Sequence, residues 1–192
     1  MNAKRLEAFS DGVMAIIITI MILEIRAPAG DGWEDLKPLF HKFIAYILSF
    51  IYVGIYWNNH HHLWQAVEHV NGKILWANLH LLFWLSLFPF STAWMGENYI
   101  SFVPVAVYGF ILFMASVAWY ILAQLVIKEE GKESRVGQAF QSDKKTKVSM
   151  VIYAVATVIA IYQPFVSICI YALVAALWFI PDKRIEKKLK DR

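Results

Sequence analysis

Three consecutive histidines are the densest set of reactive side chains in the sequence. His60, His61 and His62 close an apolar segment, and His80 lies in the next one. Imidazole nitrogens bind transition metals and haem iron. Consecutive residues of a helix point about 100° apart, so the three cannot easily hold one ion together. Because no carboxylate or cysteine stands at ligand spacing beside them, the sequence predicts no metal site.

A serine and a carboxylate at one end of an apolar segment form the second chemical feature. Residues 5–26 read RLEAFSDGVMAIIITIMILEIR, with Ser10 and Asp11 close to the start. An ionisable residue inside a membrane segment is a functional-site hypothesis that requires a named partner. If this segment enters from the cytoplasm, the serine and the carboxylate lie at the same depth as Asn78 and the histidines. We expect them to hydrogen-bond to this His/Asn group and thereby to fix the rotation of the first helix.

The composition is that of a protein with several membrane segments. Of 192 residues, 59% are hydrophobic and only 17% are charged, which is less charge than a soluble domain of this length carries. The net charge of +3 is too small to indicate nucleic acid as a partner, and the single cysteine, Cys169, excludes an internal disulfide. No nucleophile–base pair or acidic cluster falls at membrane depth, so the sequence does not predict an enzyme.

Six apolar segments are candidate membrane helices, because about 20 apolar residues are needed to cross the hydrocarbon core. The last two form one stretch that Gln163-Pro164 divides, and we expect a tight hairpin there because proline disrupts a helix. The first segment is expected to be retained, since Asp11 and Glu24 do not suit a cleavable signal peptide. The fold class is therefore an all-α integral membrane six-helix bundle in a single domain. The predicted spans are 7–25, 38–59, 73–95, 100–127, 147–162 and 164–181.

The distribution of basic residues orients these segments. Lys4 and Arg5 precede the first segment, six Lys and Arg lie in residues 128–147, and six more lie in residues 182–192. Cytoplasmic loops carry an excess of basic residues, so both termini are predicted to be cytoplasmic. Residues 128–147 read as a flexible cytoplasmic loop. Residues 182–192 read as a solvated basic tail, or alternatively as a patch for lipid headgroups.

The first segment carries an aliphatic stripe along one side of the helix. At about 100° per residue, the stripe falls within about 60° of the position of Ile16. Asp11 lies about 140° away, on the far face. From periodicity alone, such a stripe is a lipid-facing or packing surface. Its members are Phe9, Ile16, Ile20 and Leu23, with Gly12 and Thr19 at its edge and Arg5 on its extension.

Three spaced motifs resemble those of one known family. In chain order, they resemble the pattern of the transmembrane protein 175 family of cation channels. The resemblance covers the first half of the chain by specific residues and the second half only by topology. The motifs are Arg5-x-x-x-Phe9-Ser10-Asp11-Gly12 followed by Ala15-Ile16, Thr19 and Leu23-Glu24; Tyr56-Trp57-x-x-His60-His61; and Pro89-Phe90-Ser91-Thr92.

The resemblance implies a potassium-permeable channel without a cofactor, in the plasma membrane of a prokaryote. Members with one six-helix unit are homotetramers whose first helices surround a central pore. By position, Ile16, Ile20 and Leu23 would form the constriction, with Thr19 at a polar level between them. A ring of aliphatic side chains that excludes water gates a pore by dewetting. Without a carbonyl filter, only a modest preference for K⁺ over Na⁺ among monovalent cations is expected.

Further side chains are expected to support this pore. Thr19, Ser49 and Trp84 fall near mid-membrane on three helices and would form one polar cluster behind the constriction. An equally good role for Thr19 is a hydrogen bond to its own backbone. Arg5 would be paired with an acidic residue of an adjacent chain at the cytoplasmic mouth, or would act only as a topological anchor.

Three other interpretations stay open from the residues alone. A haem held by the His60, His61 and His80 group would make a membrane redox protein. A secondary transporter favours broken helices and charges at mid-membrane, whereas the only proline break predicted here is at 163–164 and no charge falls at that depth. A six-helix protein without a pore would have a purely structural role.

Overall fold

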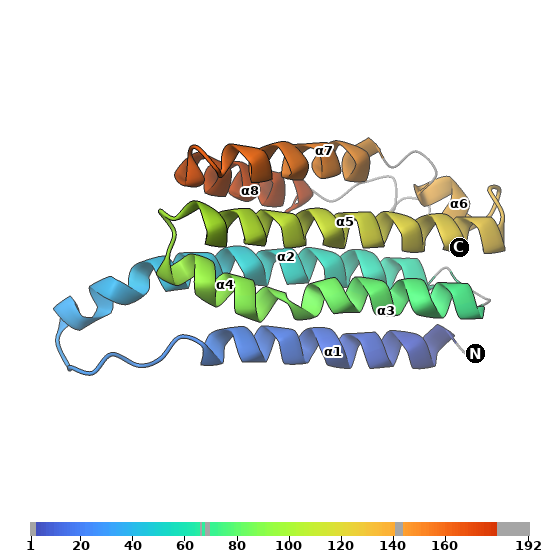
Figure 1. The fold of residues 1–192 in the computed structure, drawn as a ribbon. Coiled ribbons are helices and arrows are strands. Elements are labelled where there is room, and N and C mark those ends of the chain that lie inside the picture. The colour runs from blue at the N-terminus through green and yellow to red at the C-terminus, as the bar shows by residue number, and fades with distance from the viewer. Residues whose placement is uncertain (1–2, 66, 68–69, 141–143, 180–192) are drawn as a thin grey trace.

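The computed structural model describes residues 3–65, 67, 70–140 and 144–179, and all regular structure within them is helical. Successive long helices run antiparallel along one bundle axis, with α3 and α4 in line with each other (Figure 1). The predicted all-α fold is therefore confirmed. The helices are α1 (Ala3–Leu23), the 3₁₀ helix η1 (Trp33–Leu39), α2 (Phe40–Gln65), α3 (Gly72–Ser86), α4 (Phe88–Glu97), α5 (Phe102–Glu130), α6 (Arg135–Phe140), α7 (Lys144–Ile159) and α8 (Pro164–Phe179).

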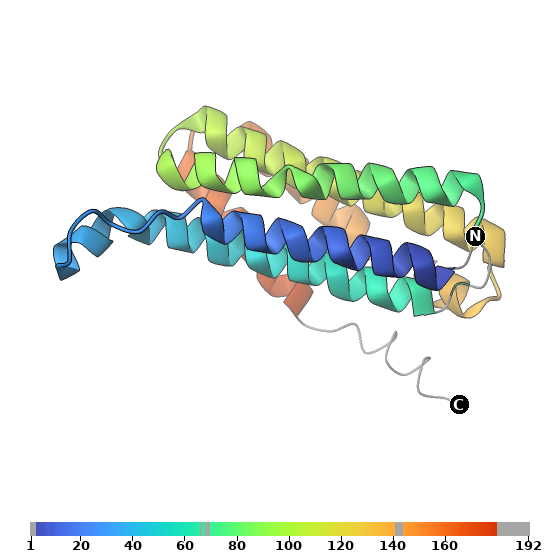
Figure 2. The ribbon, with the colours of Figure 1, turned by 90° about the horizontal axis from the view of Figure 1, so that it is seen from below.

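The first helix lies at one side of the bundle. It packs against α2, α3 and α4, whereas α7 and α8 cover α5 and α2 on the opposite side (Figure 1). Figure 2 shows α1 in front, with α2 on one side of it and the α3–α4 pair on the other. One long face of α1 therefore has no partner among the described residues of the chain.

Four helical segments are long and apolar enough to cross a membrane. They comprise residues 3–23, 33–65, 72–97 and 102–130, and they correspond to the first four predicted spans. The hairpin expected at Gln163-Pro164 is present, because α7 ends at Ile159 and α8 begins at Pro164. With 16 residues each, α7 and α8 are about 24 Å long, which is less than the hydrocarbon core of about 30 Å. Their crossing of the membrane stays a prediction.

The third predicted span is interrupted, which corrects the expectation that 163–164 holds the only proline break. The helix stops at Ser86 and restarts as α4 at Phe88. Pro89 has no N–H to donate to the carbonyl of Leu85, so the α-helical hydrogen-bond pattern cannot continue through this point. The intervening Leu87 donates its backbone N–H to the carbonyl of Trp84 at 3.3 Å instead.

The described residues of the polar segment 128–147 are largely helical. The fourth long helix, α5, continues to Glu130, residues Arg135–Phe140 form α6, and α7 already begins at Lys144. The predicted loop therefore includes helical turns, because charged residues such as Lys128 and Glu130 are good helix formers, and its place on the cytoplasmic side stays a prediction. The predicted basic tail at 182–192 lies outside the described residues.

Buried tyrosines join the helices that lie behind α1. The hydroxyl of Tyr52 on α2 donates to the backbone carbonyl of Tyr171 on α8 at 2.6 Å, and the Tyr171 hydroxyl donates to the carbonyl of Val105 on α5 at 3.3 Å. Gly109 permits this approach, because a Cβ at that position would overlap the Tyr171 hydroxyl. The bundle that supports α1 is thus closed by hydrogen bonds as well as by apolar packing.

Candidate functional site

The two faces of α1 differ sharply in burial. The face toward the bundle is buried through Leu6, Ser10, Met14, Ile17 and Met21. The predicted aliphatic stripe lies on the other face, where the exposed fractions are 53% for Phe9, 57% for Ile16, 41% for Ile20 and 76% for Leu23. Arg5, Gly12 and Thr19 are exposed on the same side.

A buried polar network joins the N-terminal half of α1 to α2 and α3. We use this name for Ser10, His60, Trp64 and Asn78. The Asn78 amide lies 2.9 Å from the Ser10 hydroxyl and 2.8 Å from Nε2 of His60. The indole N–H of Trp64 donates to the same imidazole nitrogen at 2.7 Å. Ser10, His60 and Asn78 are fully buried, so the network fixes the rotation of α1 from inside the subunit.

The hydrogen bonds of Asn78 and Ser10 follow one another in the same direction. The NH₂ group of Asn78 donates to the Ser10 hydroxyl, which in turn donates to the backbone carbonyl of Leu6 at 2.9 Å. The side-chain oxygen of Asn78 therefore faces Nε2 of His60. Nδ1 of His60 is buried and has no hydrogen-bond partner among the described residues.

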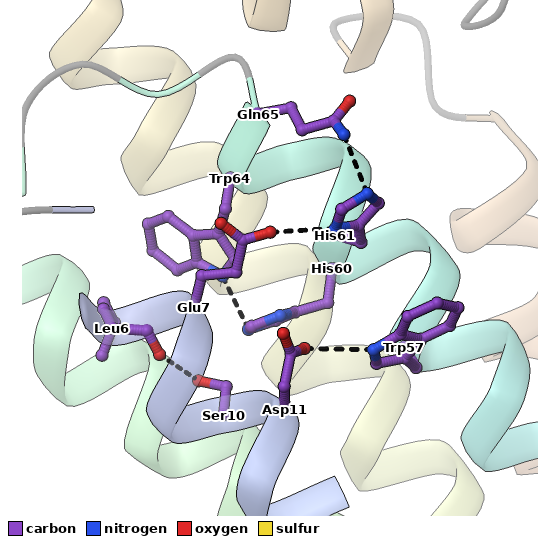
Figure 3. Close-up of polar contacts among 9 residues, drawn as sticks. All are labelled: Leu6, Glu7, Ser10, Asp11, Trp57, His60, His61, Trp64 and Gln65. Atoms are coloured by element: carbon purple, nitrogen blue, oxygen red, sulfur yellow. Dashed lines mark hydrogen bonds and ion pairs between the residues drawn. The ribbon is translucent and has the colours of Figure 1, made fainter. Parts of the chain in front are cut away.

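A second set of contacts joins the same helices at the edge of the bundle (Figure 3). The Trp57 indole donates to the Asp11 carboxylate at 3.1 Å, and Nδ1 of His61 lies 2.9 Å from the Glu7 carboxylate. The Trp57 and His61 rings stack at 5.7 Å and 12°. The expected bond from Asp11 to the His/Asn group is therefore not formed, although Ser10 does contact Asn78.

The expected mid-membrane cluster of Thr19, Ser49 and Trp84 is not formed either, because each side chain has a different partner. The hydroxyl of Thr19 donates to the backbone carbonyl of Ile16 at 2.9 Å, and the indole of Trp84 donates to His80 at 2.9 Å. Ser49 is fully buried elsewhere. It accepts from Thr92 at 2.7 Å and is hydrogen-bonded to Tyr108 at 2.9 Å.

The histidines are engaged with protein groups. His60 contacts Asn78, His61 contacts Glu7, and His80 accepts from Trp84. In the described part of the chain, no group of three or more His, Cys, Asp or Glu could hold a metal ion. Arg5 has no hydrogen bond or ion pair among the described residues, and the two acids closest to it in sequence are bound to α2.

Sequence reasoning assigned no role to several residues that hold α1. Trp57 and Thr92 stood inside quoted motifs without a role of their own, and Trp64 was not a candidate. A signal was nevertheless present, because Glu7 and Asp11 are four residues apart, as are Trp57 and His61. Pairs at this spacing lie one above the other on a helix, so two such pairs can meet across one interface.

Comparison with known proteins relates the chain to channels. Residues 5–89 match the family model described as "Endosomal/lysosomal potassium channel TMEM175". A protein of Chryseobacterium sp. (strain P1-3), named as a potassium channel, is 53% identical over 191 residues and covers all of both chains. Another named potassium channel, from Streptomyces collinus, is 36% identical over 129 residues, 63% of each chain.

The fold is also found among solved structures, and one of them superimposes on nearly the whole chain. It is the crystal structure of a TMEM175 homologue from Chamaesiphon minutus, titled a lysosomal potassium-selective channel homologue. The superposition has a TM-score of 0.79 and covers 93% of this chain and 96% of that one, at 24% sequence identity. At this identity the likeness establishes the arrangement of the helices.

Proposed function

Because the chain belongs to the TMEM175 family, a family of channels and not of enzymes, we propose that it is a subunit of a bacterial potassium channel. The permeation path is formed by four copies, with the exposed face of α1 from each copy around a central pore. The channel lies in the plasma membrane with both termini in the cytoplasm, requires no cofactor, and prefers K⁺ modestly over Na⁺.

The observation that carries this proposal is the exposed aliphatic face of α1. Ile16, Ile20 and Leu23 are among its most exposed side chains, whereas the opposite face of α1 is packed on the bundle. A lipid-facing surface would explain the aliphatic residues, but Gly12 and Thr19 on the same side contribute little apolar surface. A pore wall explains both, because an aqueous path tolerates a hydroxyl and a bare backbone.

The geometry also supports a gate. Rings of four Ile16, four Ile20 and four Leu23 side chains would stack along the pore axis at intervals of about 4.5–6 Å. Such apolar rings exclude water when α1 has its present orientation, and a small rotation of α1 would replace them with smaller or more polar side chains. K⁺ is favoured over Na⁺ because it loses its hydration shell more readily.

The polar contacts of α1 give the pore wall a defined rotation. The buried polar network holds one side of the helix, and the contacts of Asp11 and Glu7 with α2 hold the adjacent side. Under this proposal, the Phe-Ser-Asp motif sets the direction in which the stripe points and does not itself contact the permeant ion.

The direction of the last helix supports the proposed topology. The chain returns in α8 toward the end of the bundle where α1 begins (Figure 1). Lys4 and Arg5 at the start of α1 and Lys128 near the end of α5 lie at this same end, as the positive-inside rule expects for a cytoplasmic side.

The test is K⁺ flux into liposomes for the wild type and for Ile16→Asn. The wild type should conduct K⁺ faster than Na⁺, and the substitution should raise flux because it hydrates the constriction. The matched control is Val151→Asn on α7, which is 64% exposed on the opposite side of the bundle and should leave flux unchanged. Equal effects of the two substitutions, or no K⁺ flux in the wild type, would contradict the proposal.

A further inference from the structure

Three lysines begin α7, on the side of the bundle away from α1 (Figure 1). Lys144, Lys145 and Lys147 lie in the first turn of this helix, which contains no acidic residue. We call these three side chains the lysine patch. The positive end of the helix dipole disfavours cations at this position, so the lysines do not serve the stability of α7. Lys144 and Lys147 are exposed, and the patch therefore presents concentrated positive charge at the surface of the protein.

Two ammonium groups of the lysine patch lie over aromatic rings of the neighbouring helices. Nζ of Lys145 is 4.7 Å from the ring centroid of Trp178 on α8. Nζ of Lys147 is 5.6 Å from the ring centroid of Tyr120 on α5. The indole N–H of Trp178 donates to the Ser149 hydroxyl at 2.9 Å, which fixes the ring beside Lys145. An ammonium group has three N–H donors, so contact with a ring on one side leaves donors for an anion on the other.

The level of the lysine patch along the bundle is that of lipid headgroups. Tyr120 lies 18 residues after Phe102, the first residue of α5, which is about 27 Å along the helix. With the outer edge of the hydrocarbon core at Phe102, the inner edge of a core of about 30 Å falls just beyond Tyr120. The remaining residues of α5, up to Glu130, extend about 15 Å further. Tryptophan and tyrosine are enriched at this boundary, where their rings meet the headgroups.

We infer that the lysine patch binds the phosphate group of an anionic phospholipid in the cytoplasmic leaflet. The inference rests on the topology given under the proposed function, in which this end of the bundle faces the cytoplasm, and not on ion conduction. Charge complementarity supports it, because a headgroup phosphate offsets both the lysine charges and the helix dipole. Retention of basic residues on the cytoplasmic side needs the lysines but not their position over aromatic rings at headgroup depth.

The test is a titration of the purified protein in detergent with phosphatidylglycerol or phosphatidylcholine, in which native mass spectrometry counts the bound lipid. The wild type should bind the anionic lipid more tightly than the zwitterionic one. Lys144→Gln and Lys147→Gln should each weaken phosphatidylglycerol binding about fivefold, which corresponds to about 1 kcal/mol per lysine. The double variant should weaken it about 25-fold, and phosphatidylcholine binding should not change. Two single variants are used, so either one that folds tests the patch.

The matched control is Lys73→Gln, which makes the same change of charge at the same end of the bundle. Lys73 is exposed in the first turn of α3, next to Asn71, whose amide donates to Glu129 near the end of α5 at 2.7 Å. It therefore lies beyond the headgroup level of Tyr120, and this variant should bind phosphatidylglycerol as the wild type does.

Three results would overturn the inference. They are equal wild-type binding of the two lipids, equal losses in the patch variants and Lys73→Gln, and displacement of phosphatidylglycerol by millimolar inorganic phosphate, which would assign the patch to free phosphate. Each of them would leave the proposed channel intact, because no ion flow is measured. Absence of wild-type K⁺ flux in liposomes that contain phosphatidylglycerol would contradict the channel and leave the lipid site intact.

Discussion

Removal of the hydrogen bond between Ser10 and Asn78 should lower the unfolding free energy of the protein. Part of this loss should be a coupling energy between the two residues, which a double-mutant cycle measures. The two side chains lie 2.9 Å apart, are fully buried, and join α1 to α3. Interhelical hydrogen bonds in membrane proteins contribute about 0.6 kcal/mol on average and up to about 1.7 kcal/mol. Because neither group can exchange its partner for water, we expect a coupling energy of about 1 kcal/mol or more.

The measurement is a double-mutant cycle with Ser10→Ala and Asn78→Leu. Leucine keeps most of the side-chain volume and removes both amide contacts, so the cavity contribution stays small. The unfolding free energy of the four proteins in mixed micelles gives the coupling directly. The hydroxyl of Ser10 also donates to the carbonyl of Leu6 at 2.9 Å, and the cycle subtracts the loss of that bond.

The control cycle combines Asn78→Leu with Ser167→Ala. Ser167 is equally buried, and its hydroxyl donates to the carbonyl of Ala156 at 2.7 Å, in the α7–α8 hairpin. This pair should be additive within about 0.3–0.5 kcal/mol. If Ser10 and Asn78 were equally additive, the buried polar network would not hold α1, and its role in setting the rotation of the pore helix would be refuted.

Two further substitutions test neighbouring contacts. Trp57→Phe keeps the ring beside His61 but removes the donor to Asp11. The unfolding free energy should fall by about 0.6 kcal/mol, and the ratio of K⁺ to Na⁺ flux should stay unchanged. A changed ratio would place Asp11 in the ion path. Gly109→Ala places a Cβ against the Tyr171 hydroxyl and should lower the unfolding free energy by about 1–3 kcal/mol. The double variant with Tyr171→Phe should recover part of this loss. An unchanged stability would show that the α5–α8 contact is loose.

The alignment of the aliphatic side chains along one face of α1 could be predicted, because this alignment depends only on helix geometry. A rotation of about 100° per residue places Phe9, Ile16, Ile20 and Leu23 on one side, whatever packs against the other. The structure places this side outward. The meeting of Ser10 with Asn78 also followed from the sequence, since both lie at the same depth in a bundle of antiparallel helices.

The partners of Asp11 and Ser49 could not be predicted in the same way. Depth fixes the level of a side chain but not the direction in which its helix faces. Asp11 therefore meets the Trp57 indole and not a histidine, and Ser49 meets Thr92 and Tyr108 and not Trp84. These directions are set by helix packing, which one sequence does not display.

The break at Pro89 was accessible to sequence reasoning and was missed. A proline inside an apolar segment removes one backbone hydrogen bond wherever it occurs. Pro89 belongs to the Pro89-Phe90-Ser91-Thr92 motif, and its place inside an apolar segment is a sufficient signal for the break. Its consequence is structural, because α4 carries Thr92 to the hydroxyl of Ser49 and to within 3.8 Å of the Met21 sulfur on the buried side of α1.

The central claim is that the exposed face of α1 lines the ion path, and thiol modification at the outer end of that face tests it most directly. In a Cys169→Ser background, Leu23→Cys and Ile22→Cys place thiols on adjacent residues that point about 100° apart. Leu23 is 76% exposed on the stripe and Ile22 is 40% exposed beside it. A charged thiol reagent added outside liposomes should abolish K⁺ flux through Leu23→Cys and leave Ile22→Cys unchanged. Complete modification of Leu23→Cys, verified by mass spectrometry, without loss of flux would contradict the account.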